Sequence, residues 1–331
     1  MMEATNRPAL TLASFIRNGE TSGRLAVVID EASMVDLISF GGVTSLLPED
    51  AKLVIVGDPH QLAPVGPGLI LHCLTDLPSV PHVELKTAKR FGNKLANLAN
   101  HVKDGVFPLM EQFDEEIRFI PTGNSDMVDR ASNLYLEQPD DTIVLCATRT
   151  IAKSINSVVQ KALTAGCKPL RLWSLEFDLW EHTGFYEGDL VICTRNHWDL
   201  GIQNGSIGRL IEVLDQPESD GSDGPLAIGM IEWDDGEVRL LHEDLLDNLE
   251  LGYALTVHKS QGSQWRRVIT CLPQGSRILD RSLVYTALTR SQKDVVLLGS
   301  HAELVTEVNR EKAADRRRVG LKRRLCAIVS V

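Results

Sequence analysis

The sequence predicts an α/β protein with two parallel-sheet domains, the second interrupted by a small antiparallel β unit. The chain has 331 residues, about the length of two domains. Short continuous apolar runs alternate with stretches of helical periodicity, as in parallel sheets buried on both faces. Over residues 184–241, short β-rich runs are instead separated by turn clusters, which is typical of antiparallel strands.

The first domain is predicted from two buried strands and a helix. The strands are the apolar runs Leu25–Ile29 and Leu53–Val56. Each ends in polar residues at the carboxyl edge of the sheet, where α/β proteins bind ligands. A helix is expected over Lys94–Lys103, because Asp104 and Gly105 end its periodic pattern.

The second domain repeats this pattern on both sides of the β unit. Before the unit, a strand is expected over Ile143–Ala147 and a helix over Ile151–Leu163. After it, the expected order is helix, strand, helix and strand, over Leu255–Gln261, Val268–Leu272, Ser282–Thr289 and Val295–Leu298. Turn pairs such as Asn204-Gly205 punctuate the β unit, which is predicted to be barrel-like.

Composition excludes several classes of protein. Hydrophobic residues at 43 % and charged residues at 24 % exclude a disordered chain. No signal peptide is readable, and no uncharged apolar run reaches the roughly 18 residues that span a bilayer, so we expect a cytoplasmic protein without membrane contact. The six cysteines include no C-x-x-C pair, which favours reduced thiols over a disulfide framework or zinc site.

The charge is unevenly distributed. The net charge of −11 argues against a wholly basic nucleic-acid coat. Residues 212–250 carry thirteen acidic side chains and one basic one, whereas residues 310–324 carry eight basic and two acidic side chains. The basic stretch is compatible with DNA binding, although a solvated helix face is the simpler interpretation.

Two carboxylates follow the first predicted strand, in the string LAVVIDEAS. In a Walker B arrangement, the carboxylate of Asp30 would hold Mg²⁺ on a nucleotide and that of Glu31 would deprotonate the attacking water. A strand that ends in a helix cap, formed by Asp30 or Ser33, explains the same residues. Taken alone, this string favours the cap.

The loop after the second strand favours nucleotide chemistry. Its string LVIVGDPHQLAPVGPG places Gly57, Asp58 and Gln61 where parallel pairing brings them beside Asp30 and Glu31. A carboxylate and an amide beside a metal-binding carboxylate suit the sensing of a γ-phosphate. A simple Gly-Asp-Pro turn explains only the first three residues of this loop.

Four strings, in order, resemble the motifs of one family. DEAS, GDPHQLAPVGPG, TVHKSQGSQW and VYTALTR resemble motifs II, III, V and VI of the superfamily 1 helicases, most closely the RecD-like 5′-to-3′ branch. Residues 83–108 resemble the motif IV region, and residues 3–16 resemble the segment between motifs Ia and II. The resemblance covers nearly the whole chain, and the order of four motifs makes it specific.

The resemblance implies two RecA-like domains, the first incomplete, with an SH3-like β-barrel inserted in the second. Residues 1–107 would hold motifs II, III and IV of the first domain, and residues 108–183 would begin the second. Residues 184–250 would form the SH3-like insertion, and residues 251–331 would hold motifs V and VI and the basic tail.

The resemblance also assigns the residues of a site for ATP and Mg²⁺. Asp30 would coordinate Mg²⁺ and Glu31 would be the catalytic base. Gln61 would contact the γ-phosphate or the attacking water, in one cofactor-binding loop with Gly57 and Asp58.

Two arginines would act as arginine fingers, because a guanidinium fork stabilises the charge of a transferring phosphoryl group. They are Arg90 and Arg290. Around Arg90 the string KRF departs from the family's F-R-Q pattern, so Lys89 could share the role. For Arg290 the alternative is a helix-end arginine that neutralises a carboxylate, but the string VYTALTR favours the finger.

In this family motif V touches single-stranded DNA. The candidates here are Thr256, His258, Lys259 and Ser260. Such polar groups grip a phosphodiester backbone without reading bases, so RNA stays open as a substrate, and helix capping explains any one of them but not the set. Three tryptophans, Trp198, Trp233 and Trp265, could stack on bases, although core packing is the simpler role.

The string G-x-x-x-x-G-K-[ST], which cradles phosphates, does not occur in this sequence. We therefore expect the C-terminal portion of an ATP-dependent DNA helicase, from a truncated or split gene or a fragmentary gene model. It would be inactive by itself or dependent on a separate P-loop-bearing segment, with nuclease subunits as further partners. The alternative is a non-catalytic single-stranded DNA-binding or scaffold protein derived from a helicase.

Overall fold

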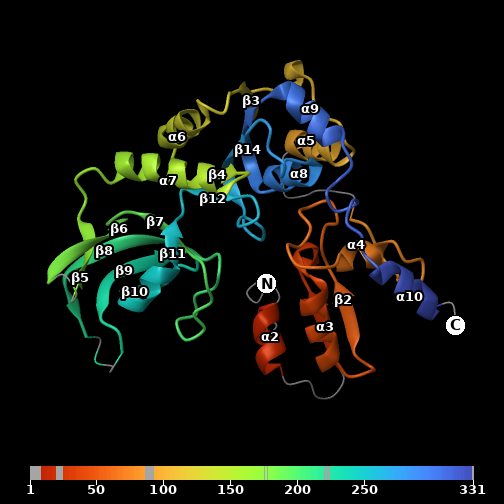
Figure 1. The fold of residues 1–331 in the computed structure, drawn as a ribbon, viewed down its shortest axis with the longest axis horizontal. Coiled ribbons are helices and arrows are strands. Elements are labelled where there is room, and N and C mark those ends of the chain that lie inside the picture. The colour runs from red at the N-terminus through yellow and green to blue at the C-terminus, as the bar shows by residue number, and fades with distance from the viewer. Residues whose placement is uncertain are drawn as a thin grey trace. The chain divides into compact units, whose positions relative to one another are not determined.

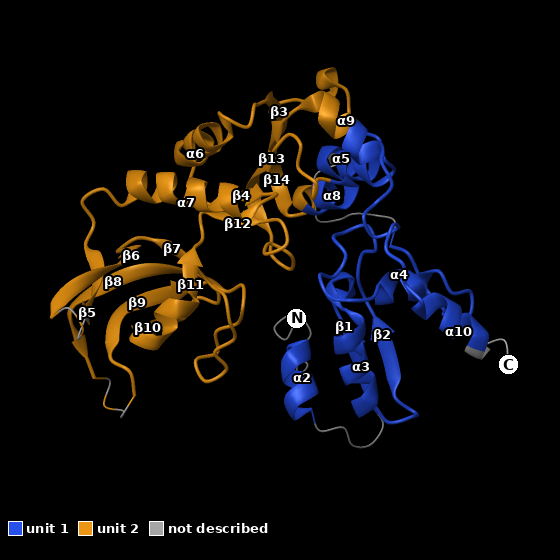
Figure 2. Cartoon of the chain, in the orientation of Figure 1, with its two compact units in different colours: residues 1–107, 280–286, 306–331 blue, residues 108–279, 287–305 orange. Residues whose placement is uncertain are grey.

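The chain folds into two compact units, which Figure 2 colours separately. The computed structural model describes residues 9–19, 25–85, 93–174, 176, 178–219, 221 and 224–329. Unit 1 comprises residues 1–107, 280–286 and 306–331, and unit 2 comprises residues 108–279 and 287–305. The predicted domain boundaries stay a prediction. Residues 280–286 and 306–331 belong to unit 1, whereas the sequence analysis groups them with motif V in the second domain.

Unit 1 is built on a two-stranded parallel sheet (Figure 1). Strand β1 (Ala26–Ile29) pairs with β2 (Lys52–Ile55), and both lie where the apolar runs predicted them. Between them run the 3-10 helix η1 (Ala32–Met34) and helix α3 (Leu37–Leu46), whose first turn is capped by Asp36. One face of the sheet packs with these helices around a core of Ile29, Ala32, Val35, Val43 and Leu71.

The other helices of unit 1 come from distant parts of the chain. They are α2 (Leu12–Asn18), α4 (Ile70–Thr75), α5 (Asn93–Lys103), the first six residues of α8 (Arg281–Leu288) and α10 (Leu321–Val329). Helix α5 confirms the helix predicted over residues 94–103. Helix α10 contacts α4, so the end of the basic stretch is part of this unit.

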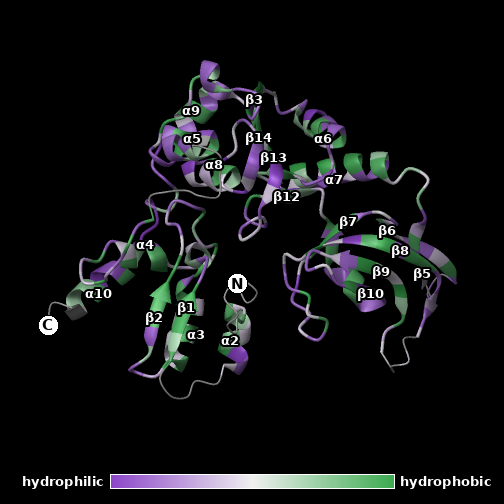
Figure 3. Cartoon of the chain, turned by 180° about the vertical axis from the view of Figure 1, so that it is seen from behind, coloured by the Kyte–Doolittle hydropathy of each residue, from purple (hydrophilic) through white to green (hydrophobic). Residues whose placement is uncertain are grey.

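The second face of the β1–β2 sheet is exposed and apolar. Val28 and Val54 alternate with inward-facing neighbours and are 54 % and 49 % exposed, and Val56 just after β2 is 45 % exposed. Figure 3 shows the apolar character of both strands. Within the described residues, β1 pairs along one edge only, with β2. Parallel sheets are normally covered on both faces, whereas this sheet leaves one apolar face exposed to solvent.

Unit 2 contains a five-stranded parallel sheet in the order β12-β4-β13-β14-β3. The strands are β3 (Ile117–Pro121), β4 (Thr142–Cys146), β12 (Ala254–Thr256), β13 (Trp265–Leu272) and β14 (Ser291–Gly299). Helices α6 (Met127–Glu137) and α7 (Arg149–Leu163) pack on it, and α9 (His301–Asn309) follows β14. The sheet confirms the predicted α/β class. Every residue of β4 is buried, as its continuous apolar run predicts.

One predicted element is wrong. Residues 255–261 were expected to be helical, but residues 254–256 form strand β12 and the following residues form turns. Leu255 pairs in register with Leu145 of β4, and all three strand residues are buried. The seven-residue run is apolar only at its start, so its periodicity could not distinguish a short buried strand followed by a loop from a helix.

An antiparallel β unit interrupts the parallel sheet in sequence, between α7 and β12. Its five strands lie in the order β10-β9-β8-β7-β11. They are β7 (Leu190–Cys193), β8 (Ile207–Glu218), β9 (Ala227–Trp233), β10 (Val238–His242) and β11 (Leu249–Leu251). A two-stranded ribbon of β5 (Pro169–Ser174) and β6 (Leu179–Tyr186) precedes them. The SH3-like identity of this unit stays a prediction.

Unit 2 also contains two short 3-10 helices, η2 (Met110–Gln112) and η3 (Glu243–Asn248).

Cys146 and Cys271 are buried opposite each other on β4 and β13, and burial raises the pKa of the Cys146 thiol well above its usual value. In the described part of the chain, no helix combines the length and apolar character needed to cross a membrane.

Candidate nucleotide and DNA sites

The carboxylate pair lies directly after β1, at the carboxyl end of the strand. Glu31 adopts the left-handed conformation, with φ 50° and ψ 40°, and its backbone N–H donates to Oδ1 of Asp30 at 2.9 Å. A non-glycine residue pays about 1–2 kcal/mol for this conformation. Backbone strain of this kind gathers at functional sites. The N-cap position of η1 is taken by Glu31, which makes no side-chain capping bond, and not by Asp30 or Ser33.

The ends of β1 and β2 are tied together by their backbones. The N–H of Val56 donates to Ile29 O at 2.8 Å, and the N–H of Ala32 donates to Val56 O at 2.9 Å. A Cβ atom on Gly57 would lie 3.0 Å from the backbone nitrogens of Ala32 and Ser33. Gly57 therefore acts by letting the loop after β2 approach the carboxylate loop.

Gln61 is the polar group in this loop that is left without a partner. Its side chain is 9 % exposed, and its Oε1 atom is buried with no hydrogen-bond partner in the described structure. Asp58 is already engaged, because Oδ1 accepts from the N–H of His60 at 2.9 Å and Oδ2 from the hydroxyl of Tyr285 at 2.6 Å. A buried amide oxygen without a partner costs about 1–3 kcal/mol and needs a donor such as a bound water.

These residues fit one end of a nucleotide. Mg²⁺ is usually held by one or two carboxylates, phosphate oxygens and waters, and Asp30 is an exposed carboxylate. Its position beside Glu31 fits a metal bound to phosphate together with a general base. In the described residues, no group of three or more His, Cys, Asp or Glu side chains could hold a metal without such phosphates.

The structure describes only one of the two candidate arginine fingers, Arg290. Arg90 and its neighbour Lys89 lie outside the described residues. Arg290 is 3 % exposed and donates to Ser263 O and to Oγ1 of Thr289, both at 3.3 Å. Arg290 belongs to unit 2, so its role beside the carboxylates of unit 1 stays a prediction.

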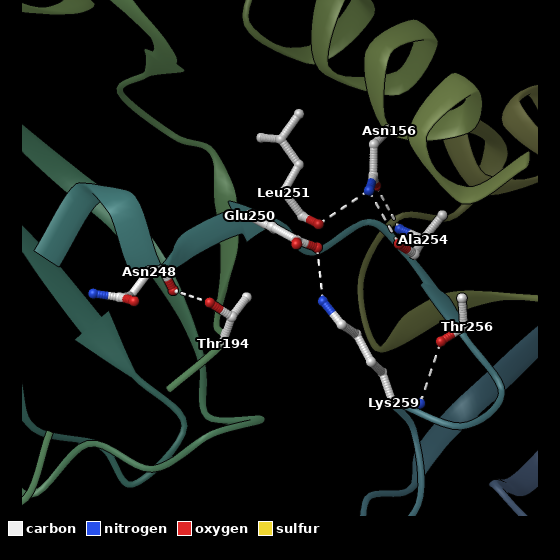
Figure 4. A network of polar contacts seen from close by, with 8 residues as sticks. All are labelled: Asn156, Thr194, Asn248, Glu250, Leu251, Ala254, Thr256 and Lys259. Atoms are coloured by element: carbon white, nitrogen blue, oxygen red, sulfur yellow. Dashed lines mark hydrogen bonds and ion pairs between the residues drawn. The ribbon is translucent and has the colours of Figure 1, made fainter. Parts of the chain in front are cut away.

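The motif V candidates divide into buried and partly exposed residues, and Figure 4 draws two of them, Thr256 and Lys259. Ser260 is fully buried and donates to Val257 O at 2.8 Å, and Thr256 is 9 % exposed and accepts from Lys259 N at 3.4 Å. These two hydroxyls shape the loop. His258 is half-buried, and Lys259 forms an ion pair with Glu250 at 2.7 Å. Lys259 is therefore partly exposed and already paired with a carboxylate, and its role in binding DNA stays a prediction.

Asn156 on α7 holds the chain leading into motif V. Its Oδ1 accepts from Ala254 N at 2.6 Å, and its Nδ2 donates to Leu251 O and Ala254 O at 3.0 Å (Figure 4).

Of the tryptophans considered for base stacking, Trp233 is 3 % exposed and belongs to the core of the β unit. Trp198 is 38 % exposed and remains compatible with stacking.

Sequence reasoning missed a buried carboxylate that joins the β unit to the parallel sheet. Asp189 is fully buried, and its oxygens accept from the Tyr253 hydroxyl, the Gln160 amide and the Tyr186 backbone, each at 2.7 Å. Burial raises the pKa of Asp189, and the three donors oppose that rise. The only signal in the sequence is an acidic residue directly before the apolar run Leu190–Cys193.

Comparisons with known proteins agree with the motifs. Residues 1–120 match the family described as AAA domain, and residues 251–298 match the UvrD-like helicase C-terminal domain. The RecBCD enzyme subunit RecD of Mycolicibacterium smegmatis is 30 % identical over 322 residues, which cover 90 % of this chain and 54 % of that protein. The ATP-dependent RecD2 DNA helicase of Deinococcus radiodurans is 26 % identical over 87 % of this chain and 38 % of its own length.

Solved structures show the same fold. The Pif1 helicase from Bacteroides, in complex with ADP-AlF3 and single-stranded DNA, superposes with a TM-score of 0.54 at 17 % identity, over 92 % of this chain and 75 % of its own. The chain spans about half the length of the RecD relatives that it matches. With four motifs in order, RecD relatives over nine-tenths of its length and a Pif1-like fold, the chain belongs to the RecD-like family of superfamily 1 helicases.

Proposed function

We propose that this chain supplies the Walker B, motif III, V and VI part of an ATP-dependent DNA helicase that moves on single-stranded DNA. The observation that carries the proposal is the pairing of a strained, left-handed Glu31 beside Asp30 with the buried, unpartnered amide oxygen of Gln61 on the adjoining loop. A protein that only binds DNA has no physical need for this combination.

In this proposal each residue has a separate task. Mg²⁺, when bound, would neutralise charge on the phosphates, and Asp30 would hold it. Glu31 would accept the proton of the attacking water, and the Gln61 amide would orient that water or contact the γ-phosphate. Arg90 and Arg290 would stabilise the charge of the transferring phosphoryl group. Lys259, with His258, would bind the DNA backbone.

The phosphate cradle would come from a separate P-loop-bearing segment, in the same polypeptide or in another. Two observations support this: the P-loop string does not occur in the sequence, and one face of the β1–β2 sheet exposes Val28 and Val54. Added chain on this face would bury an apolar surface that parallel sheets normally cover. Nuclease subunits are further candidate partners, because RecD relatives are named as subunits of the RecBCD enzyme.

The test combines the chain with the P-loop segment of a RecD relative and measures phosphate release with and without single-stranded DNA. We expect near-background turnover by the chain alone and DNA-stimulated turnover by the combination. Glu31→Gln should lower the restored rate by orders of magnitude while leaving DNA binding unchanged. Vigorous turnover by the chain alone would contradict this account of the nucleotide site.

The second candidate is a non-catalytic DNA-binding protein that retains the fold. The missing P-loop string is the observation that favours it. Single-stranded DNA binding that persists while no P-loop segment restores hydrolysis would support this candidate over the first.

A further inference from the structure

The C-terminal segment, defined as residues 306–329, folds against the loop after β2 within unit 1. Lys312 Nζ lies 2.7 Å from Nδ1 of His60, and Arg317 donates to Pro64 O at 2.6 Å. Ala314 is 3 % exposed and packs with Leu69 just beyond the loop. Part of the basic stretch is therefore internal to unit 1 and does not serve only as a solvated or DNA-facing surface.

The same loop is held from a second direction by the first residues of α8. The Tyr285 hydroxyl donates to Asp58 at 2.6 Å, and the N–H of Leu62 donates to Oγ1 of Thr286 at 2.8 Å. The ring of His60 meets the ring of Tyr285 edge-on, with centroids 6.2 Å apart. Gln61 lies between these attachments, so its position depends on them.

The contact between Lys312 and His60 determines which nitrogen of the His60 imidazole carries the proton. An ammonium group has donors only, so Nδ1 of His60 must accept and the ring proton must sit on Nε2. Burial, followed by the charge of Lys312, lowers the pKa of His60, which keeps the ring neutral. Asp58, Lys103 and Glu84 also act on His60 electrostatically.

Lys312 is itself half-buried, and burial lowers the pKa of its ammonium group. Asp58 and Asp315 oppose this shift, whereas Arg281 and Lys103 add to it. A partly buried ammonium needs an acceptor, and the imidazole of His60 supplies one. The pair therefore links a residue of the C-terminal segment to the residue directly before Gln61.

We infer that Lys312 is a positioning residue of the nucleotide site, which fixes the loop of residues 57–62 through His60 and so presents the Gln61 amide. This inference rests on the proposed function for its catalytic consequence. The contact between Lys312 and His60 is observed in the structure and does not depend on the proposed function. The C-terminal segment then contributes to hydrolysis without touching the nucleotide.

The first experiment uses the full 331-residue chain and needs no nucleotide. Nitrogen NMR of ¹⁵N-histidine-labelled chain should show the Nε2–H tautomer for His60, assigned by comparison with His60→Asn. Lys312→Met should raise the pKa of His60 by about one pH unit, because it removes a nearby positive charge. Lys312→Arg should keep the pKa low, and Arg316→Met, an exposed control in the same segment, should not change it. An unchanged pKa in Lys312→Met would overturn the inference.

The second experiment measures turnover after the P-loop segment has been supplied. Lys312→Met should lower kcat about tenfold with little change in KM for ATP, Lys312→Arg should recover most of the rate, and Arg316→Met should match the wild type. If Lys312→Met does not fold, His60→Ala replaces it and should lower kcat about tenfold, because it removes the acceptor, whereas in His60→Asn the asparagine oxygen still accepts from Lys312 and most of the rate should persist.

The outcomes separate the two proposals. Absence of turnover in the wild-type combination would refute the proposed function, while the NMR result would still decide the Lys312–His60 bond. Wild-type turnover together with an unchanged kcat in Lys312→Met, or equal rates in His60→Ala and His60→Asn, would overturn the positioning role.

Discussion

Replacing Asp189 should reveal how strongly the β unit is joined to the strand that leads into motif V. Asp189→Ala leaves three donors without an acceptor: the Tyr253 hydroxyl, the Gln160 amide and the Tyr186 N–H. At about 1–3 kcal/mol for each unsatisfied buried group, and allowing for incomplete additivity, the loss is about 3–5 kcal/mol. For a unit of this size that lowers the Tm by about 10 °C or more.

Asp189→Asn is the matched control. The asparagine oxygen can replace Oδ2 and accept from Gln160 and Tyr186, while its amide donates to the Tyr253 hydroxyl, which can turn to accept. All three hydrogen bonds persist and the buried charge is removed. The free energy of unfolding should therefore change by less than about 1 kcal/mol at neutral pH.

The pH dependence of stability has a definite sign. Burial raises the pKa of Asp189 in the folded state above its unfolded value, so the folded protein binds the proton more tightly. The contribution of Asp189 is most favourable below the unfolded pKa and is lost as the pH rises through the folded pKa. Asp189→Asn lacks this loss, so its stability relative to the wild type should increase across that window.

Tryptophan fluorescence during urea unfolding measures these effects in unit 2, because all five tryptophans lie there: Trp173, Trp180, Trp198, Trp233 and Trp265. The reasoning fails if Asp189→Ala stays within 1 kcal/mol of the wild type, or if Asp189→Asn is as unstable as the alanine variant.

Three further predictions concern the sites and the open sheet. Glu250→Gln should strengthen single-stranded DNA binding by releasing Lys259, and Lys259→Ala should weaken it and flatten its salt dependence; fluorescence anisotropy at several salt concentrations tests both, and equal salt slopes would contradict the role of Lys259. Gly57→Val should destabilise unit 1 by about 1–3 kcal/mol, seen as faster hydrogen exchange in β1 and β2, because its Cβ meets backbone at 3.0 Å; unchanged exchange would argue against the close approach. Val54→Thr should reduce self-association in sedimentation at little cost in stability, since the side chain is 49 % exposed, and a large loss of stability would show that this face is covered.

Local patterns determined much of this protein. The continuous apolar runs predicted strands β1, β2 and β4, although only β4 is buried throughout, whereas β1 and β2 leave one face exposed. The loops that carry Glu31 and Gln61 adjoin each other because parallel strands end at the same edge of the sheet, and the order of strands and polar residues in the sequence predicts this.

The conformations of those residues were decided by tertiary structure. The left-handed backbone of Glu31 and the burial of Gln61 depend on packing between loops, which no propensity of a single residue encodes. The strand β12 shows the same principle, since Leu255 is extended because it pairs with Leu145, 110 residues earlier in the chain.

Long-range polar contacts lay beyond what the sequence could predict. Lys312 and His60 are 252 residues apart, and Tyr285 and Asp58 are 227 apart. In the sequence Lys312 is one of eight basic residues in a stretch that reads as a solvated helix face. Composition and periodicity specify which residues are buried and where strands end, because these depend on near neighbours. Which cation meets which acceptor depends on how the chain returns on itself, and only the folded structure contains that information.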